Sequence, residues 1–302
     1  MKTVLVAGAT GYLGRNIVKY YMAQGWLVRA LVRDAEKARS SGLDATEFFE
    51  GEGTEPESLI GVMDGVDLVI SALGITRQRD GLDYRQVDFQ ANANLLTEAE
   101  SADVIRFAYV HVLNAKAMKG VPMVDAKQAF VDRLQASALP STVICPSGFF
   151  SDMADFYTMS KAGRVWLFGD GSIRMNPIDG ADLASAIGHA IEQKREFVEI
   201  GGPDILSHRE IAELAFAVRS KPVRITNLPD IIRRAAIHLL PFVTPKHIHG
   251  PALMFLKAMG MHMVGEIHGT KHLNDHFGEL ARHDAEAPRQ RSSISKEVQN
   301  AH

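Results

Sequence analysis

Three glycines near the N-terminus have the spacing of a turn that could hold a diphosphate. Gly8, Gly11 and Gly14 follow the apolar run 3–7 and open an amphipathic segment that begins at Tyr12. Gly8 would allow a tight turn, Gly11 a close approach of backbone to a pyrophosphate, and Gly14 close packing of the helix on the strand. The helix N-terminus would add unpaired N–H groups and partial positive charge. Strand, glycines and helix together predict a dinucleotide site.

The end of the second predicted strand, 27–32, bears on the choice between NAD and NADP. An acidic residue there would bind the ribose 2′-hydroxyl of NAD, whereas an arginine would suit the 2′-phosphate of NADP. Arg33 is the first residue after the strand, and its guanidinium fork matches a phosphate. Asp34 is the competing residue, although it could instead cap the next helix. We expect NADP(H) to be preferred, with NAD(H) as the alternative.

Other strand ends should face the same ligand, because ligands of open α/β sheets lie outside the carboxyl ends of the strands. Glu52 follows the third strand and is expected near the adenine, and the small residues after the fourth strand are expected along the ribose. The residues of the glycine turn and of these loops that we predict to contact the cofactor are Gly8, Thr10, Gly11, Tyr12, Leu13, Gly14, Arg33, Glu52, Ser71, Ala72, Leu73 and Gly74.

The elements that position these residues alternate between two hydrophobic periods. Short β-branched runs and amphipathic segments follow one another through the first 200 residues, which is typical of a parallel sheet with crossover helices. Strands are predicted at 3–7, 27–32, 46–50, 67–72, 105–110, 142–145 and 197–200. Helices are predicted at 12–24, 56–63, 84–100, 124–137 and 180–193. The predicted fold is therefore a doubly wound, parallel-sheet α/β domain of the Rossmann type.

The rest of the chain predicts a smaller, mainly helical region. We expect a nucleotide-binding core over 1–150 and a substrate or partner region over 151–281, interleaved with the last strands of the sheet. Ser207 and Glu210 form a capping box before a helical run. The polar composition of 282–302 predicts a disordered tail.

Two apolar segments, 231–240 and 251–264, are open to several interpretations. They could line a pocket or the core, form a dimer seam, or lie on a membrane surface with Arg233, Arg234 and Lys257 extended toward the headgroups. Core or pocket lining is the favoured interpretation.

Histidines at 268, 272 and 276 have a spacing that could bind zinc on one helix face. Gly269 weakens a continuous helix there, so no metal site is predicted.

Composition excludes several classes of protein. The chain has 302 residues and a formal net charge of −3, which gives no electrostatic footprint for nucleic acid. The single cysteine, Cys145, excludes an intramolecular disulfide and favours a reducing cytoplasm. No apolar run approaches the ~18 residues of a membrane span.

Several motifs resemble the short-chain dehydrogenase/reductase superfamily, most closely its atypical NmrA-like branch. They are the segments 8–14, 32–33, 144–150, 169–171, 176–178, 182–184 and 269–273. That branch includes NADPH-dependent reductases, redox-sensing regulators and assembly factors of photosynthetic or respiratory complexes. The resemblance adds Pro146, Gly148 and Phe149 to the expected cofactor site.

The catalytic set of the superfamily is a strand-end serine and a Tyr-x-x-x-Lys pair. The resemblance places the lysine at Lys127, the tyrosine at Met123 and the serine at His111. A thioether cannot act as a general acid. Lys127 could still bind the ribose, and an unperturbed His111 would titrate near neutral pH, with Tyr109 on the same side of the strand. The alternative for His111 is a packed strand-end histidine, which we favour.

The expected function is NADP(H)-dependent reduction of a small or apolar substrate. Loss of the tyrosine favours the alternative, a non-catalytic NAD(P)H-binding redox sensor or assembly factor with a protein partner. A sugar-nucleotide epimerase or dehydratase is a third alternative, which the missing tyrosine disfavours strongly. Whether the protein is an enzyme is left open.

Overall fold

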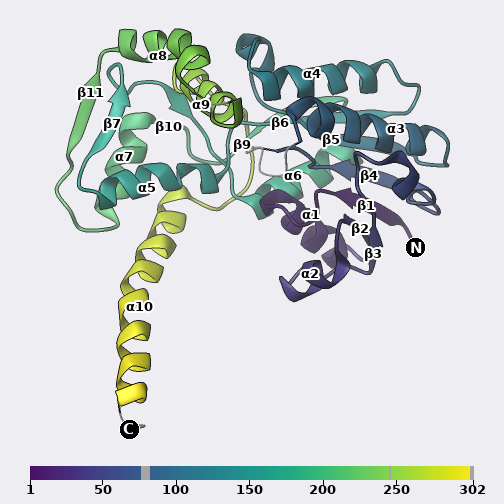
Figure 1. Ribbon diagram of the computed structural model, residues 1–302, viewed down its shortest axis with the longest axis horizontal. Coiled ribbons are helices and arrows are strands. Elements are labelled where there is room, and N and C mark those ends of the chain that lie inside the picture. Colours follow the sequence, from purple (N-terminus) through teal and green to yellow (C-terminus); the bar gives the residue numbers. More distant parts are fainter. Residues whose placement is uncertain (76–81, 245, 300–302) are drawn as a thin grey trace.

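A parallel sheet forms the centre of the computed structural model, which describes residues 1–75, 82–244 and 246–299 (Figure 1). Its eight strands are ordered β12-β9-β6-β5-β4-β1-β2-β3, and every neighbouring pair is parallel. The strands are β1 (Thr3–Ala7), β2 (Leu27–Val32), β3 (Glu47–Glu50), β4 (Leu68–Ser71), β5 (Arg106–Val110), β6 (Ser141–Pro146), β9 (Phe197–Gly201) and β12 (Glu266–Ile267). The predicted doubly wound α/β fold is confirmed, and β1 and β2 have the predicted bounds.

Helices cover both faces of this sheet. α1 (Tyr12–Ala23) and α6 (Gly180–Glu192) pack together on one face, while α3 (Asn92–Glu100) and α4 (Pro122–Gln135) cover the other. Successive residues of β1 point to opposite faces of the sheet. Val4 therefore packs in the core beneath α1 and α6, and Leu5 in the core beneath α3 and α4. Shorter helices are α2 (Ala35–Ser40) and the 3₁₀ segments η1 (Pro56–Leu59), η3 (Ala115–Met118) and η4 (Phe150–Met153).

The predicted helix 84–100 is not a uniform α-helix. It begins as a π-helix, η2 (Arg85–Ala91), and continues as α3. The side-chain amide of Asn92 donates to the backbone carbonyls of Val87 and Asp88, at 3.3 and 3.1 Å. A side chain that bonds the backbone of the preceding turn accounts for this local distortion.

In the described residues, the C-terminal region carries two small two-stranded sheets and several helices outside the central sheet. β7 (Val165–Phe168) pairs in parallel with β11 (Ile225–Leu228), and β8 (Arg174–Met175) pairs antiparallel with β10 (Leu206–Ser207). The helices are α5 (Ala154–Lys161), α7 (His208–Ala217), α8 (Asp230–Val243) and α9 (Lys246–Ala258). The predicted capping box is present: Ser207 Oγ accepts from the Glu210 N–H at 3.2 Å, and Glu210 Oε2 from the Ser207 N–H at 2.7 Å.

A helix covers residues 282–299 of the segment 282–302, for which the sequence predicted a disordered tail. α10 spans Leu273–Gln299 and extends away from the body of the protein (Figure 1). Its first turns are held by packing, since Leu273 and Phe277 are fully buried. Asp284 then accepts from the Tyr157 hydroxyl at 3.0 Å and pairs with Lys161 at 2.8 Å. These tertiary contacts stabilise the N-terminal part of α10, and they cannot be predicted from composition alone.

Candidate functional site

The glycine turn at the end of β1 has the close packing that its spacing predicted. Gly8 has a φ of +79°, and a Cβ there would lie 2.9 Å from the carbonyl group of Ala72. A Cβ on Gly14 would lie 2.0 Å from the Gly8 carbonyl oxygen. Only glycine fits at either position, so α1 starts directly against the end of β1 and beside the loop after β4.

The N-terminus of α1 is open to an anion. In the described structure no side chain caps this helix, and its first turn holds no acidic residue. Thr10, Gly11 and Tyr12 are exposed around it, while Leu13 is buried beneath. The free N–H groups and the helix dipole therefore face an accessible surface, which suits a diphosphate.

Tyr12 joins the glycine turn to the loop after β6. Its ring packs edge-on against Phe149, with centroids 5.8 Å apart, and its hydroxyl accepts from the Gly180 N–H at 3.0 Å. Gly148 precedes Phe149 in this loop, and Pro146 ends β6. Two sequence segments that the family resemblance had linked are thus adjacent in space.

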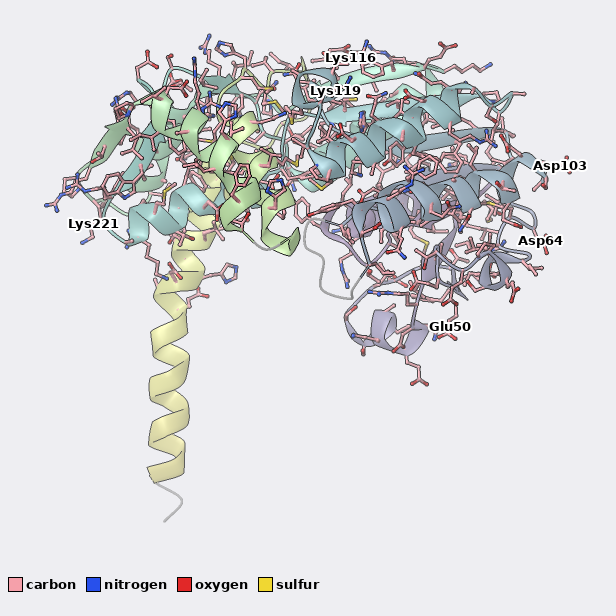
Figure 2. All side chains as sticks on the ribbon, turned by 45° about the horizontal axis from the view of Figure 1, so that its top comes forward. Glu50, Asp64, Asp103, Lys116, Lys119 and Lys221 are labelled. Atoms are coloured by element: carbon pink, nitrogen blue, oxygen red, sulfur yellow. The ribbon has the colours of Figure 1, made fainter. Side chains whose placement is uncertain are left out.

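The ends of β2 and β3 meet at the other side of the turn. Asp34 caps α2, its Oδ1 accepting from the Lys37 N–H at 2.8 Å. Glu50, labelled in Figure 2, accepts from the Ala35 N–H at 2.8 Å. Both carboxylates therefore serve α2. Arg33 is 65% exposed, with its Nε 3.9 Å from Glu52 Oε2. Arg33, the cation nearest the expected position of the ribose 2′-phosphate, therefore lies beside a carboxylate.

Lys127 lies beneath the loop that follows β4. Its ammonium group is 3.3 Å from Asp88 Oδ1 and 3.4 Å from the Tyr109 hydroxyl. The carbonyls of Leu73 and Val110 lie at 3.4 and 3.3 Å. A Cβ on Gly74 would lie 2.7 Å from the ammonium nitrogen, so the loop passes directly over it. Lys127 therefore connects the loop after β4 with β5 and η2.

The Lys127–Asp88 pair is almost wholly removed from water. The Asp88 side chain is fully buried and that of Lys127 is 12% exposed. Burial raises the pKa of Asp88, and the nearby Lys127 offsets this only in part. Burial alone would lower the pKa of Lys127, but Tyr109 and Asp88 outweigh it and the pKa is raised. The lysine is held as an ammonium ion at neutral pH.

The position expected for the family's tyrosine is occupied by a buried apolar group. Met123 packs with Tyr84 and Ala126, and the partly buried Ile75 and Met254 pack against this cluster. Met254 comes from α9, so the C-terminal region covers this part of the site. A thioether neither donates nor accepts a transferable proton. The phenol pKa of Tyr84 is raised by burial and by Asp88.

His111 is a buried histidine, which is the interpretation that the sequence analysis favoured, and its pKa is perturbed. Burial, and then the charge of Lys127, lower its pKa to about 4. Its ring lies nearly parallel to that of Tyr109, with centroids 6.3 Å apart, and its Nε2 is 3.2 Å from Gln128 Oε1. Tyr109 does share its side of the strand, but it is fully buried and burial raises its pKa to about 12.

We expect NMR to show a neutral His111 imidazole at every pH above about 5. A pKa lowered in the folded state means that the unfolded chain takes up the proton first, so His111 withdraws stability as pH falls from about 6.5 to about 4. His272 serves as the control, because hydrogen bonding to Asp204 raises its pKa. Titration of His111 above pH 6 would contradict this prediction.

The three histidines with zinc-like spacing have separate surroundings. His272 Nδ1 is 2.9 Å from Asp204, His268 lies 3.9 Å from Glu266, and His276 packs near Phe150. Gly269, with a φ of +80°, separates His268 from α10. Among the described residues no cluster could hold a metal ion.

Asp88 is the site residue that the sequence analysis missed. It shares the buried side of its helix with Val87, Ala91 and Leu95. A carboxylate and, four residues later, the Asn92 amide on an apolar helix face were the available signal, because such groups need buried partners.

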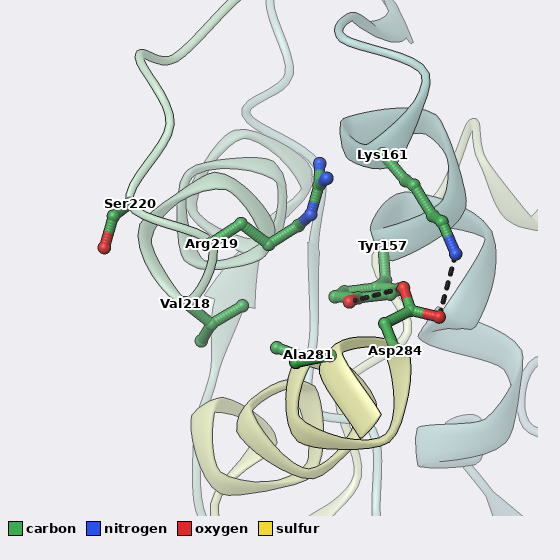
Figure 3. Close-up of a pocket in the computed structure, with 8 residues that line it drawn as sticks. Tyr157, Lys161, Val218, Arg219, Ser220, Ala281 and Asp284 are labelled. Atoms are coloured by element: carbon green, nitrogen blue, oxygen red, sulfur yellow. Dashed lines mark hydrogen bonds and ion pairs between the residues drawn. The ribbon is translucent and has the colours of Figure 1, made fainter. Parts of the chain in front are cut away.

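A separate open groove lies between α5, α7 and α10 (Figure 3). Its volume is about 530 Å³. The residues that line it are Tyr157, Lys161, Val218, Arg219, Ser220, Ala281, Asp284 and Ala285. None of them belongs to the strand ends around the glycine turn, so the groove is not part of the candidate cofactor site.

Sheet topology and glycine turn define a Rossmann-like α/β protein. The chain belongs to the NmrA-like family, whose model matches residues 1–276. No helix in the described part of the chain is long and apolar enough to cross a bilayer.

Individual relatives include proteins of different activities. Photosystem II assembly factor Ycf39 from Synechocystis is 28% identical over 235 residues, 76% of this chain and 72% of Ycf39. NAD(P)H azoreductase from Xenophilus azovorans is 26% identical over 227 residues, 73% of this chain and 75% of the relative. An NADPH-dependent quinone oxidoreductase from Escherichia coli, solved with NADPH, superposes with a TM-score of 0.68 at 18% identity, over 92% of this chain and 99% of the other.

Proposed function

We propose that this protein binds NADP(H) along the carboxyl ends of β1, β2, β4 and β6. The observation that carries the proposal is the uncapped N-terminus of α1 behind Gly8 and Gly14, where no Cβ could be accommodated. The pyrophosphate would be held by the N–H groups of this turn. Arg33 would contact the 2′-phosphate, because Asp34 is engaged in capping α2. NADPH on the related quinone oxidoreductase and the azoreductase's use of NAD(P)H support this assignment.

The residues of this chain would bind and orient rather than exchange protons. Leu73, Gly74 and Lys127 would hold the nicotinamide ribose, with the charge of Lys127 fixed by Asp88. When bound, NADPH supplies a hydride to an electron-poor acceptor. Met123 cannot supply the accompanying proton, and His111 is neutral at working pH. Water would therefore provide it, which suits acceptors whose reduced anion is stable until it is protonated.

We therefore propose a reductase of small, apolar, conjugated acceptors. The apolar cluster around Met123 and Met254 supports an apolar substrate, and relatives named as azo and quinone reductases support the reaction type. The second candidate is a cofactor-binding partner protein without turnover. It is supported by Met123 in place of an acid and by the similarity to Ycf39.

Acceptor-dependent oxidation of NADPH separates the two candidates. We expect absorbance loss of NADPH on adding a quinone or an azo dye, with no comparable loss in their absence. Saturable NADPH binding without oxidation by any acceptor would favour the partner protein. Absence of binding would overturn both candidates.

A further inference from the structure

The outer side of α8 is apolar and exposed. Ile231, Leu239 and Phe242 are 68%, 57% and 84% exposed, and Ile232 is 45% exposed. On a helix these residues fall on a continuous arc of about 100°, with Ala235 between them. The predicted core or pocket lining is therefore wrong for this side of 231–240, although it holds for Leu253 and Met259 of the second segment.

The inner side of the same helix already has its partner. Leu240 is buried, and Arg233 donates to the Leu256 carbonyl of α9 at 2.9 Å while pairing with Asp230 at 2.6 Å. α9 also packs against α4, so α8 lies at the rim of the C-terminal region (Figure 1). The exposed arc is consequently not needed for packing within the chain. A helix that is apolar on two sides requires a second apolar environment.

Charge in the sequence segment that contains this helix is strongly asymmetric. Residues 218–264 include a single acidic residue, Asp230, in a chain whose net charge is −3. The basic residues of that segment are Arg219, Lys221, Arg224, Arg233, Arg234, Lys246 and Lys257. Lys221 and Arg224 are exposed, and Figure 2 shows Lys221 at the outer edge of the C-terminal region. On α8 itself, the exposed Arg234 shares the carboxylate of Asp230 with Arg233, so this end of the helix carries a net positive charge beside the apolar arc.

We propose that α8 docks the protein on the surface of a membrane that contains anionic lipids. The apolar arc would enter the boundary between headgroups and acyl chains, while Arg234, beside the arc, contacts the headgroups. A second copy of this chain is a poorer occupant, because a symmetric contact through α8 would bring like charges together. The proposal does not depend on cofactor binding or on turnover.

Vesicle flotation of the full chain tests the proposal. We expect the protein to float with vesicles of phosphatidylcholine and phosphatidylglycerol, to float less with phosphatidylcholine alone, and to be released in part by salt. The double variant Leu239→Gln/Phe242→Gln should bind the mixed vesicles about tenfold more weakly or worse, because it removes apolar area from the contact. Both side chains are exposed, so the variant should fold normally.

Ile60→Gln is the matched control, since Ile60 is 74% exposed but lies outside the C-terminal region. It should bind vesicles as the wild type does. An equal loss of vesicle binding in Ile60→Gln and in the double variant would overturn the proposal, and so would a wild-type protein that does not float with the vesicles. A wild-type dimer that fails to float and that the double variant dissociates in sedimentation experiments would overturn it in favour of a second copy.

Discussion

Replacing Gly14 by alanine is expected to abolish cofactor binding and to destabilise the fold. The new Cβ would lie 2.0 Å from the Gly8 carbonyl oxygen and 2.8 Å from the Cα of Ala9. Both are backbone atoms that cannot rotate away, so α1 must shift from β1. Overpacking of this kind costs about 3 kcal/mol in free energy of unfolding. The shift also moves the N–H groups that would bind the pyrophosphate, so we expect the dissociation constant for NADPH to rise by about 100-fold or more.

Denaturant unfolding and NADPH fluorescence titration measure the two effects. Gly278→Ala is the control, because a Cβ at this α10 position would meet no atom within 4 Å. It should leave binding unchanged and stabilise the helix by up to about 1 kcal/mol. A Gly14→Ala protein that binds NADPH as tightly as the wild type would contradict the assigned role of the turn.

Replacing Lys127 by methionine is expected to have the second large effect, on stability. The ammonium group would be lost while the fully buried Asp88 carboxylate remained. Breaking a buried ion pair in this way costs about 3–5 kcal/mol. Without the cation the pKa of Asp88 should rise further, so the deficit should shrink as the pH is lowered and the carboxyl becomes neutral.

Chemical denaturation at neutral and at mildly acidic pH measures this loss. The double variant Asp88→Asn/Lys127→Met should recover much of the stability, because neither charge remains buried. Two results would contradict the inferred role of the ion pair in stabilising the loop after β4. One is a loss of less than about 1 kcal/mol in the free energy of unfolding of the single variant, and the other is a loss that does not change with pH.

The sequence predicted the sheet well because its strands are buried on both faces. The segments that form β1 and β2 are short, rich in β-branched residues and bounded by turn signals, so the sequence predicted where each strand begins and ends. The glycine spacing likewise predicted which backbone positions would leave no room for a Cβ. Convergence of the loops after β1, β4 and β6 followed from the parallel topology.

Features set by tertiary contacts were not readable from sequence. β12 has only two residues and joins the sheet because of its neighbour β9, so no periodicity marks it. The low pKa of His111 depends on burial beside Lys127, which lies 16 positions later in the chain. Apolar residues occur on both sides of α8, and the positions of α9 and β7 distinguish the packed side from the exposed one.

The most direct test of the central claim is a fluorescence titration with NADPH and with NADH at matched salt. We expect saturable binding, with NADPH clearly tighter, and Arg33→Ala should reduce that preference by roughly 10-fold or more through loss of a charge-assisted contact. Lys37→Ala, an exposed change nearby on α2, should leave the preference intact. Binding of neither nucleotide would contradict the account, because the glycine turn would then be a structural feature alone.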